Sequence, residues 1–272
     1  MTIEFKVRDI PVGPTIAHVW HGGDGFPILL MHGAGPGTSA VANFGKVREP
    51  LAARYHIYAT DMIGFGKSGR KSEPPYFDYP LWVEQMQAVL DQIPAGPVGL
   101  LGHSISATFA LRLAATNERV KKVLLSCPMG RPLMANAQLE QLWTFPETRE
   151  ELRTSLEVLF HDHSVITDAL LTSRMAILAE PGYGEYFRKV FGGDKQDLVD
   201  QTIVEDDVIG NVACPVSIVH GRNDIAFPIE QTAYPLADLL PHADVHALAR
   251  CSHGPAFERT EAFLSIAFDF FG

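Results

Sequence analysis

The sequence predicts an α/β fold in which a mainly parallel sheet carries helices on both faces and a helical lid is inserted between two strands. Residues 1–127 and 212–272 alternate short apolar runs with helix-patterned stretches, which is typical of parallel strands joined by crossover helices. The segment between them is helix-patterned and shows no strong strand pattern. We therefore expect a core domain at 1–129 and 208–272 and a lid at 130–207.

The first part of the sequence predicts strands and a glycine-rich loop. Residues 1–6 alternate apolar and polar side chains like a strand, so we expect no signal peptide there. An apolar run at 27–31 predicts a buried strand, and three glycines fall within the six residues of the loop 32–37 that follows. Glycines let a backbone approach a ligand closely. Their spacing differs from the GxGxxG of dinucleotide sites, so we expect no such cofactor.

A serine stands between a predicted strand and a predicted helix in the middle of the chain. Residues 98–101 form an apolar run, Gly102 allows a tight turn, and 107–115 are helix-patterned and rich in alanine. A serine on such a turn projects its hydroxyl from the start of a helix, as a nucleophile requires. The pattern predicts Ser104 as a nucleophile, although Ser106 replaces the last glycine of the usual G-x-S-x-G motif.

A serine nucleophile needs a histidine base and a carboxylate that orients the histidine. An apolar run at 216–219 precedes Asp224, and another at 245–248 precedes His253, so the three groups occur in the order serine, acid, histidine. Taken alone, Asp224 fits a turn-capping aspartate and His253 fits a surface-loop histidine. Their joint order and context favour a triad of Ser104, Asp224 and His253.

Other carboxylates fit the acid role less well. The strand predicted at 123–125 is followed by residues 126–129, which contain no carboxylate, and no strand precedes Asp206 or Asp207.

Stabilising an oxyanion requires backbone N–H donors. We expect one donor from Ile105, directly after the nucleophile, and a second from the glycine-rich loop, with Ala34 as the first choice and Gly35 as the second.

Composition narrows the class of partner. The chain has 22 basic and 32 acidic residues, a net charge of −10, which disfavours nucleic acid and anionic membranes as partners. No apolar run approaches the roughly 18 residues of a membrane span. The three cysteines, Cys127, Cys214 and Cys251, are widely separated and indicate free thiols in a reducing compartment. We therefore expect a cytoplasmic protein that acts on a small molecule.

No metal site is expected from the sequence. His161 and His163 form an i, i+2 pair, which would point in different directions on a helix, so a solvated helix end is the better interpretation. The cysteine spacing also lacks a zinc pattern.

The whole chain resembles the α/β-hydrolase superfamily, and within it the meta-cleavage-product hydrolases, which cleave C–C bonds during bacterial aromatic degradation. Four stretches carry this resemblance: the oxyanion loop and following helix, a post-strand turn, the acid loop, and a lid segment. They are 32–44 (HGAGPGTSAVANF), 61–68 (DMIGFGKS), 220–224 (HGRND) and 171–175 (LTSRM). The resemblance implies the α/β-hydrolase fold and hydrolysis of a 2-hydroxy-6-oxo-dienoate.

The resemblance also implies which residues bind the substrate. Arg174 would pair with the substrate carboxylate, and Asn43 and His103 would lie near its oxygens. Considered alone, a lid arginine is more often a solvated helix residue. The chain departs from the family where His103 replaces Asn before the nucleophile, and where Gly254 replaces Trp after the histidine.

Three functions from different classes remain open. The first is a C–C hydrolase acting on a carboxylated diketone, which Arg174 and Asn43 favour. The second is a carboxylesterase or lactonase acting on a small ester, which His103 and Gly254 favour. The third is a ligand-sensing protein with little turnover, and the complete triad argues against it. The sequence leaves open whether the protein forms a homo-oligomer.

Overall fold

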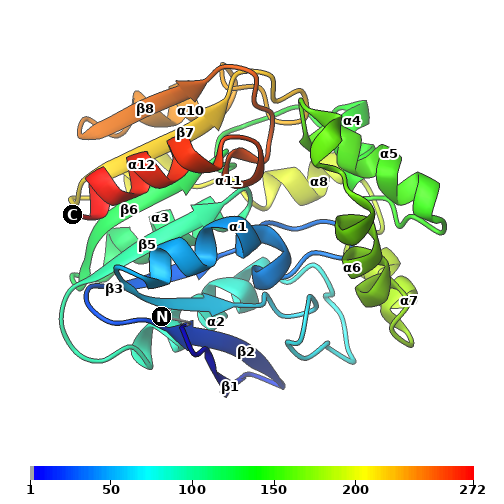
Figure 1. Ribbon diagram of the computed structural model, residues 1–272, viewed down its shortest axis with the longest axis horizontal. Coiled ribbons are helices and arrows are strands. Elements are labelled where there is room, and N and C mark those ends of the chain that lie inside the picture. The colour runs from blue at the N-terminus through cyan, green and yellow to red at the C-terminus, as the bar shows by residue number, and fades with distance from the viewer. Residues whose placement is uncertain (1–2) are drawn as a thin grey trace.

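The computed structural model describes residues 3–272 and contains one eight-stranded sheet (Figure 1). The strand order is β1-β2-β4-β3-β5-β6-β7-β8. The first three strands in this order pair antiparallel, and all other neighbours pair parallel. The strands are β1 (Lys6–Val12), β2 (Thr15–Gly22), β3 (Pro27–Met31), β4 (His56–Thr60), β5 (Val98–His103), β6 (Val120–Ser126), β7 (Val216–Gly221) and β8 (Ala243–Leu248).

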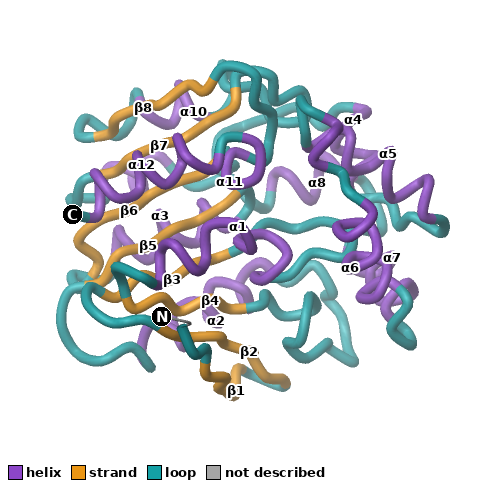
Figure 2. The backbone as a smooth tube through the Cα atoms, in the orientation of Figure 1, coloured by secondary structure: helices purple, strands orange, loops and turns teal. Residues whose placement is uncertain are grey.

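Helices cover both faces of this sheet (Figure 2). Strand β3 shows why, because Ile28 and Leu30 enter one apolar core while Leu29 and Met31 enter the other. Three helices pack on the first face, and three on the second. They are α1 (Ala40–Ala52), α11 (Pro255–Glu258) and α12 (Thr260–Phe271), and α2 (Tyr79–Asp91), α3 (Ser106–Thr116) and α10 (Ala233–Ala237).

A series of helices lies between β6 and β7 in the chain and stands at one end of the sheet (Figure 1). Residues 127–215, all of them described, contain no strand. The elements are α4 (Ala137–Leu142), α5 (Arg149–Leu159), the 3₁₀ helix η1 (His163–Val165), α6 (Asp168–Leu178), α7 (Tyr183–Val190), α8 (Lys195–Asp200) and α9 (Asp206–Gly210). Helix α9 crosses the predicted boundary at 207, and the division into core and lid stays a prediction.

The expected N-terminal strand is wrong in position. Residues 1–2 lie outside the described part of the chain, residues 3–5 are not in a strand, and β1 begins only at Lys6. The reason is pairing: β1 lies against β2 from Lys6 opposite His21 to Val12 opposite Thr15. A hairpin partner, rather than local alternation, decides where an edge strand begins. Within residues 3–272, no helix combines the length and the apolar character needed to cross a membrane.

Candidate active site

The candidate catalytic residues follow the carboxyl ends of parallel strands. Ser104 follows β5, Asp224 comes three residues after β7, and His253 comes five residues after β8. Carboxyl ends of parallel strands meet at one edge of the sheet, so the topology brings these three side chains together. All three are buried.

Ser104 occupies a strained turn. Its φ of 57° lies in the left-handed region, which a non-glycine residue adopts only when its surroundings hold it there. The surroundings here are tight, because its N–H donates to the Ser126 carbonyl at 2.9 Å. A Cβ at Gly102 would lie 2.6 Å from the Ser106 carbonyl oxygen, so only glycine fits before the turn. This local geometry is the one that the sequence motif predicts.

Asp224 and His253 form a buried pair. The Nδ1–H of His253 donates to Asp224 Oδ2 at 2.6 Å, and the Phe227 N–H donates to Oδ1 at 2.9 Å. A second imidazole, His220 Nε2, lies 3.4 Å from Oδ2. Burial alone would raise the pKa of the Asp224 carboxyl, but His253 and His220 outweigh it and hold that pKa well below its usual value. Asp224 is therefore an anion able to fix the orientation of His253.

Ser104 and His253 line the same cavity, but no hydrogen bond joins them among the described residues. Catalytic hydrogen bonds are often long without substrate and shorten when it binds. The ring of His103 lies beside them, with its centroid 4.9 Å from that of His253. Burial and the neighbouring His253 hold the pKa of His103 well below its usual value, so His103 is a neutral wall of the cavity.

Three backbone N–H groups are candidate donors to an oxyanion: Ile105 follows Ser104 in the chain, and Ala34 and Gly35 line the same cavity as Ser104. Within residues 3–272, the N–H groups of Ala34, Gly35 and Ile105 form no hydrogen bond, so they are available as donors to a ligand. Ile105 also stands at the N-terminal end of α3, which favours negative charge. Asn43 supports the same loop, because its Oδ1 accepts the Gly33 N–H at 3.0 Å.

The departure at Ser106 is accommodated locally. Its hydroxyl is fully buried and donates to the His32 carbonyl oxygen at 2.5 Å. His32 in turn accepts the Met62 N–H at Nε2, at 2.8 Å. Ser106 thus links the turn at the nucleophile to the glycine-rich loop, a contact that glycine could not make.

Arg174 comes from α6, in the predicted lid, and is buried, with 5% of its surface exposed. One hydrogen bond is formed by its guanidinium, from Nη1 to the Pro36 carbonyl at 2.9 Å, while Nε has no partner and no carboxylate pairs with it in residues 3–272. Burial lowers its pKa to about 10, so it stays charged at neutral pH. Arg174 is therefore not the solvated helix residue that a lone arginine usually is.

Comparison with known proteins identifies the family of this chain. The model of the Alpha/beta hydrolase family matches residues 28–266. The chain belongs to the alpha/beta hydrolase family. A relative from a Pseudomonas species, 2-hydroxymuconate semialdehyde hydrolase, is 30% identical over 97% of this chain and 93% of its own. A second, 2-hydroxy-6-oxo-2,4-heptadienoate hydrolase from Pseudomonas putida, is 29% identical over 91% of this chain and 90% of its own.

A solved structure agrees with these relatives. The meta-cleavage product hydrolase from Pseudomonas fluorescens superposes on this chain with a TM-score of 0.91 and 27% identity, covering 97% of each chain. The predicted α/β-hydrolase fold and the resemblance to meta-cleavage-product hydrolases are both confirmed.

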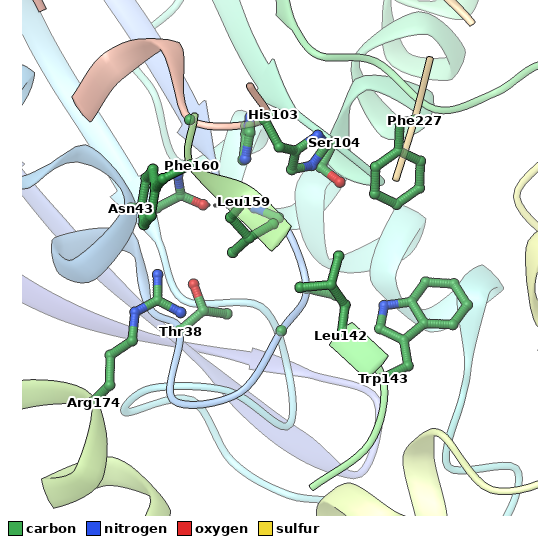
Figure 3. A pocket seen from close by; sticks show the side chains of 15 residues that line it. Thr38, Asn43, His103, Ser104, Leu142, Trp143, Leu159, Phe160, Arg174 and Phe227 are labelled. Atoms are coloured by element: carbon green, nitrogen blue, oxygen red, sulfur yellow. Dashed lines mark hydrogen bonds between the residues drawn. The ribbon is translucent and has the colours of Figure 1, made fainter. Parts of the chain in front are cut away.

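The cavity of this alpha/beta hydrolase also contains residues that the sequence did not single out. Figure 3 shows Arg174, Thr38 and Asn43 on one side of it and Leu142, Trp143 and Phe227 on the other, with Ser104 at the upper edge and Phe160 beside Asn43. The cavity is small, with a volume of ≈ 40 Å³. Its unpredicted lining residues are Thr38, Leu142, Trp143, Leu159, Phe160 and Phe227. No motif marks them, because most reach the cavity through the packing of lid helices.

One group of side chains could in principle bind a metal. Ligand atoms of Cys127, Asp224 and His253 lie within 4.8 Å of one another. Asp224 and His253 already bond to each other, and burial raises the pKa of the Cys127 thiol well above its usual value. A protonated thiol is a poor metal ligand, so this cluster fits a catalytic pair better than a metal centre. All three cysteines are free thiols.

Proposed function

We propose that the protein is a serine hydrolase that cleaves a C–C bond in a 2-hydroxy-6-oxo-dienoate, a product of aromatic ring fission. The observation that carries the proposal is Arg174, a buried and unpaired cation that lines the same cavity as Ser104 and His253. The names of the relatives support the same substrate class.

Physical chemistry explains why Arg174 indicates an anionic substrate. A buried charge without a partner is costly, and a protein keeps one when a ligand completes the pair. A guanidinium matches a carboxylate in shape and can donate to both of its oxygens. A net charge of −10 gives the protein no general attraction for an anion, so a local counter-charge is needed. We assign the substrate carboxylate to Arg174.

The triad supplies the chemistry. The dienol first tautomerises to a ketone: its O–H proton is lost and a proton adds to the carbon beside the distal carbonyl, which makes the bond between these two carbons labile. Ser104 Oγ then bonds to that carbonyl carbon while its proton passes to His253, and Asp224 stabilises the resulting imidazolium. The C–C bond breaks and its electrons take up a proton from His253. Water, deprotonated by His253, then attacks the acyl group, which leaves as a carboxylic acid while His253 returns the proton to Ser104 Oγ.

Other residues orient the substrate during these steps. The N–H groups of Ile105 and of Ala34, or alternatively Gly35, hold the negative oxygen that forms at the attacked carbonyl. Asn43 and His103 lie near the remaining oxygens of the dienoate. The apolar side of the cavity takes the group released as an acid. We propose that the enzyme needs no metal or cofactor, works in the cytoplasm on this small molecule, and binds neither nucleic acid nor membranes.

The substrate assignment is tested by Arg174→Ala. Leaving a substrate carboxylate unpaired in a buried site should cost roughly 2–5 kcal/mol in kcat/KM. A neutral p-nitrophenyl ester of similar size should be affected little. The measurement is kcat/KM of both proteins on a coloured carboxylated dienoate and on that ester, with Ser104→Ala as the inactive blank.

The alternatives give different results in the same assay. Equal, small effects of Arg174→Ala on both substrates would contradict a role in carboxylate binding and favour a carboxylesterase or lactonase. Turnover of neither substrate by the wild-type protein would favour a ligand-sensing role.

A further inference from the structure

The carboxylate of Glu258 connects the catalytic loop to the lid. Its Oε2 accepts the Ser252 N–H at 2.7 Å, directly before His253. Its Oε1 accepts two N–H groups of the lid, those of His161 at 2.7 Å and Asp162 at 2.9 Å. No cation pairs with this carboxylate among the described residues, so three backbone donors are its partners.

Apolar contacts reinforce the same junction. Phe160 precedes the two lid donors, lines the cavity and packs on Phe257, with ring centroids 5.9 Å apart. It also lies directly over Gly254, where an added Cβ would come within 2.5 Å of its ring. The Ser252 hydroxyl adds a 3.4 Å hydrogen bond to the Val158 carbonyl.

The cavity beneath this junction is too small for a substrate. Its volume of ≈ 40 Å³ is far below the several hundred Å³ of typical ligand pockets. A ligand the size of a dienoate therefore enters only if a wall moves. Phe160 is a wall residue, and the two lid residues that follow it are both hydrogen-bonded to one core side chain, that of Glu258.

We propose that Glu258 is a positioning residue that latches the lid segment 160–162 onto the catalytic histidine loop, and that substrate enters when this latch opens. The proposal rests on the proposed function only in that Ser104 marks the reaction site. A carboxylate suits a latch, because two oxygens accept from two segments at once and no buried counter-charge is needed.

The first test measures the latch without any substrate. Glu258→Ala and Glu258→Gln are compared with wild type by hydrogen–deuterium exchange and mass spectrometry. Loss of hydrogen bonds to a charged acceptor should speed exchange at 160–163 about tenfold or more. Peptides of α7 and of strands β3 and β5 should keep their wild-type rates. The matched control is Glu261→Gln, because Glu261 is an exposed carboxylate three residues later that forms no ion pair within residues 3–272.

The second test separates a latch from general loosening of the triad. In Glu258→Gln, KM should rise about tenfold for a bulky substrate while kcat changes less, because weaker closure lowers the stability of the complex more than the chemical step. Phe160→Ala, which leaves Glu258 and the catalytic loop intact, should reproduce the rise in KM. Reaction of Ser104 with a small phosphonate should keep its wild-type rate.

Clear results would overturn the latch. Wild-type exchange at 160–163 in both Glu258 variants would do so, as would exchange raised equally in the core strands. A fall in kcat and in phosphonate reactivity with KM unchanged would assign Glu258 to the triad alone. The exchange result does not depend on the substrate, so failure of the C–C hydrolase assignment would leave it unaffected.

Discussion

Asp224 fills two roles with its two carboxylate oxygens. Oδ1 accepts the Phe227 N–H three residues ahead, as a turn-capping aspartate does, and Oδ2 accepts from His253. The capping bond and the bond to the candidate base His253, which belong to interpretations that the sequence presents as alternatives, therefore coexist in one residue. The capping bond fixes the carboxylate so that its other oxygen points at the imidazole.

This double role sets an expectation for Asp224→Asn. The asparagine oxygen can still accept from Phe227, so the turn should remain, but its amide cannot accept the Nδ1–H of His253. The histidine then adopts the wrong tautomer, and kcat should fall about 10³–10⁴-fold. The measurement is kcat together with thermal unfolding. A variant with wild-type kcat would show that another carboxylate orients His253.

At the scale of elements, sequence patterns located the strands that deliver the site. The expected strand at 27–31 matches β3, and those expected at 98–101, 216–219 and 245–248 lie within longer strands. Parallel strands that are buried on both faces, such as β3 and β5, are nearly continuous apolar runs, so the sequence pattern predicts them. Their carboxyl ends then predict where the loops meet, so Ser104, Asp224 and His253 could be brought together from chain order alone.

The lid contributes what the sequence could not predict. Phe160 enters the cavity from the residue just after α5, and Trp143 from the residue just after α4. Nothing in a helical pattern says which helix end faces a distant loop, because that depends on tertiary packing. Arg174 was indicated only by the resemblance of residues 171–175 to a known family. Glu258 belongs to no motif that would mark it in the sequence.

The contact between Phe160 and Gly254 joins two elements, and it predicts the effect of Gly254→Ala. The new Cβ would lie 2.5 Å from the Phe160 ring, so the lid segment must shift. Overpacking of this kind costs about 1–3 kcal/mol in the free energy of unfolding. The double variant Gly254→Ala/Phe160→Ala should therefore lose less free energy of unfolding than the two single variants lose in sum. Additive effects in chemical denaturation would contradict direct contact.

For the molecule as a whole, two buried histidines make the fold sensitive to acid. Burial lowers the pKa of both His32 and His103. His32 shows why it must stay neutral: Nδ1–H donates to the Gly33 carbonyl at 2.7 Å, while Nε2 accepts the Met62 N–H. A proton on Nε2 would face another N–H. Both imidazoles are therefore neutral in the fold but bind protons once it unfolds.

This difference in proton binding between the folded and unfolded states determines how the stability of the fold changes with pH. An unfolded histidine has a pKa of about 6.5, so below this pH the unfolded state binds more protons than the folded state. Stability should therefore be constant above about pH 7 and fall as the pH drops from 6.5 towards 5, by up to about 1.4 kcal/mol per pH unit for each histidine. Asp224 does not oppose this trend, because its lowered pKa contributes stability that is lost only at more acidic pH.

Urea denaturation between pH 5 and 8 measures this slope directly. Replacing one buried imidazole with a side chain that does not titrate should remove its share, so His103→Asn should make the acid limb less steep, while His32 and the partly buried His21 and His56, whose pKa values are also lowered, keep theirs. His242→Asn is the matched control, since His242 is exposed and should leave the slope unchanged. A slope equal in wild type and His103→Asn would mean that His103 takes up its proton in the folded state. In that case its burial beside His253 would not exclude charge from the cavity.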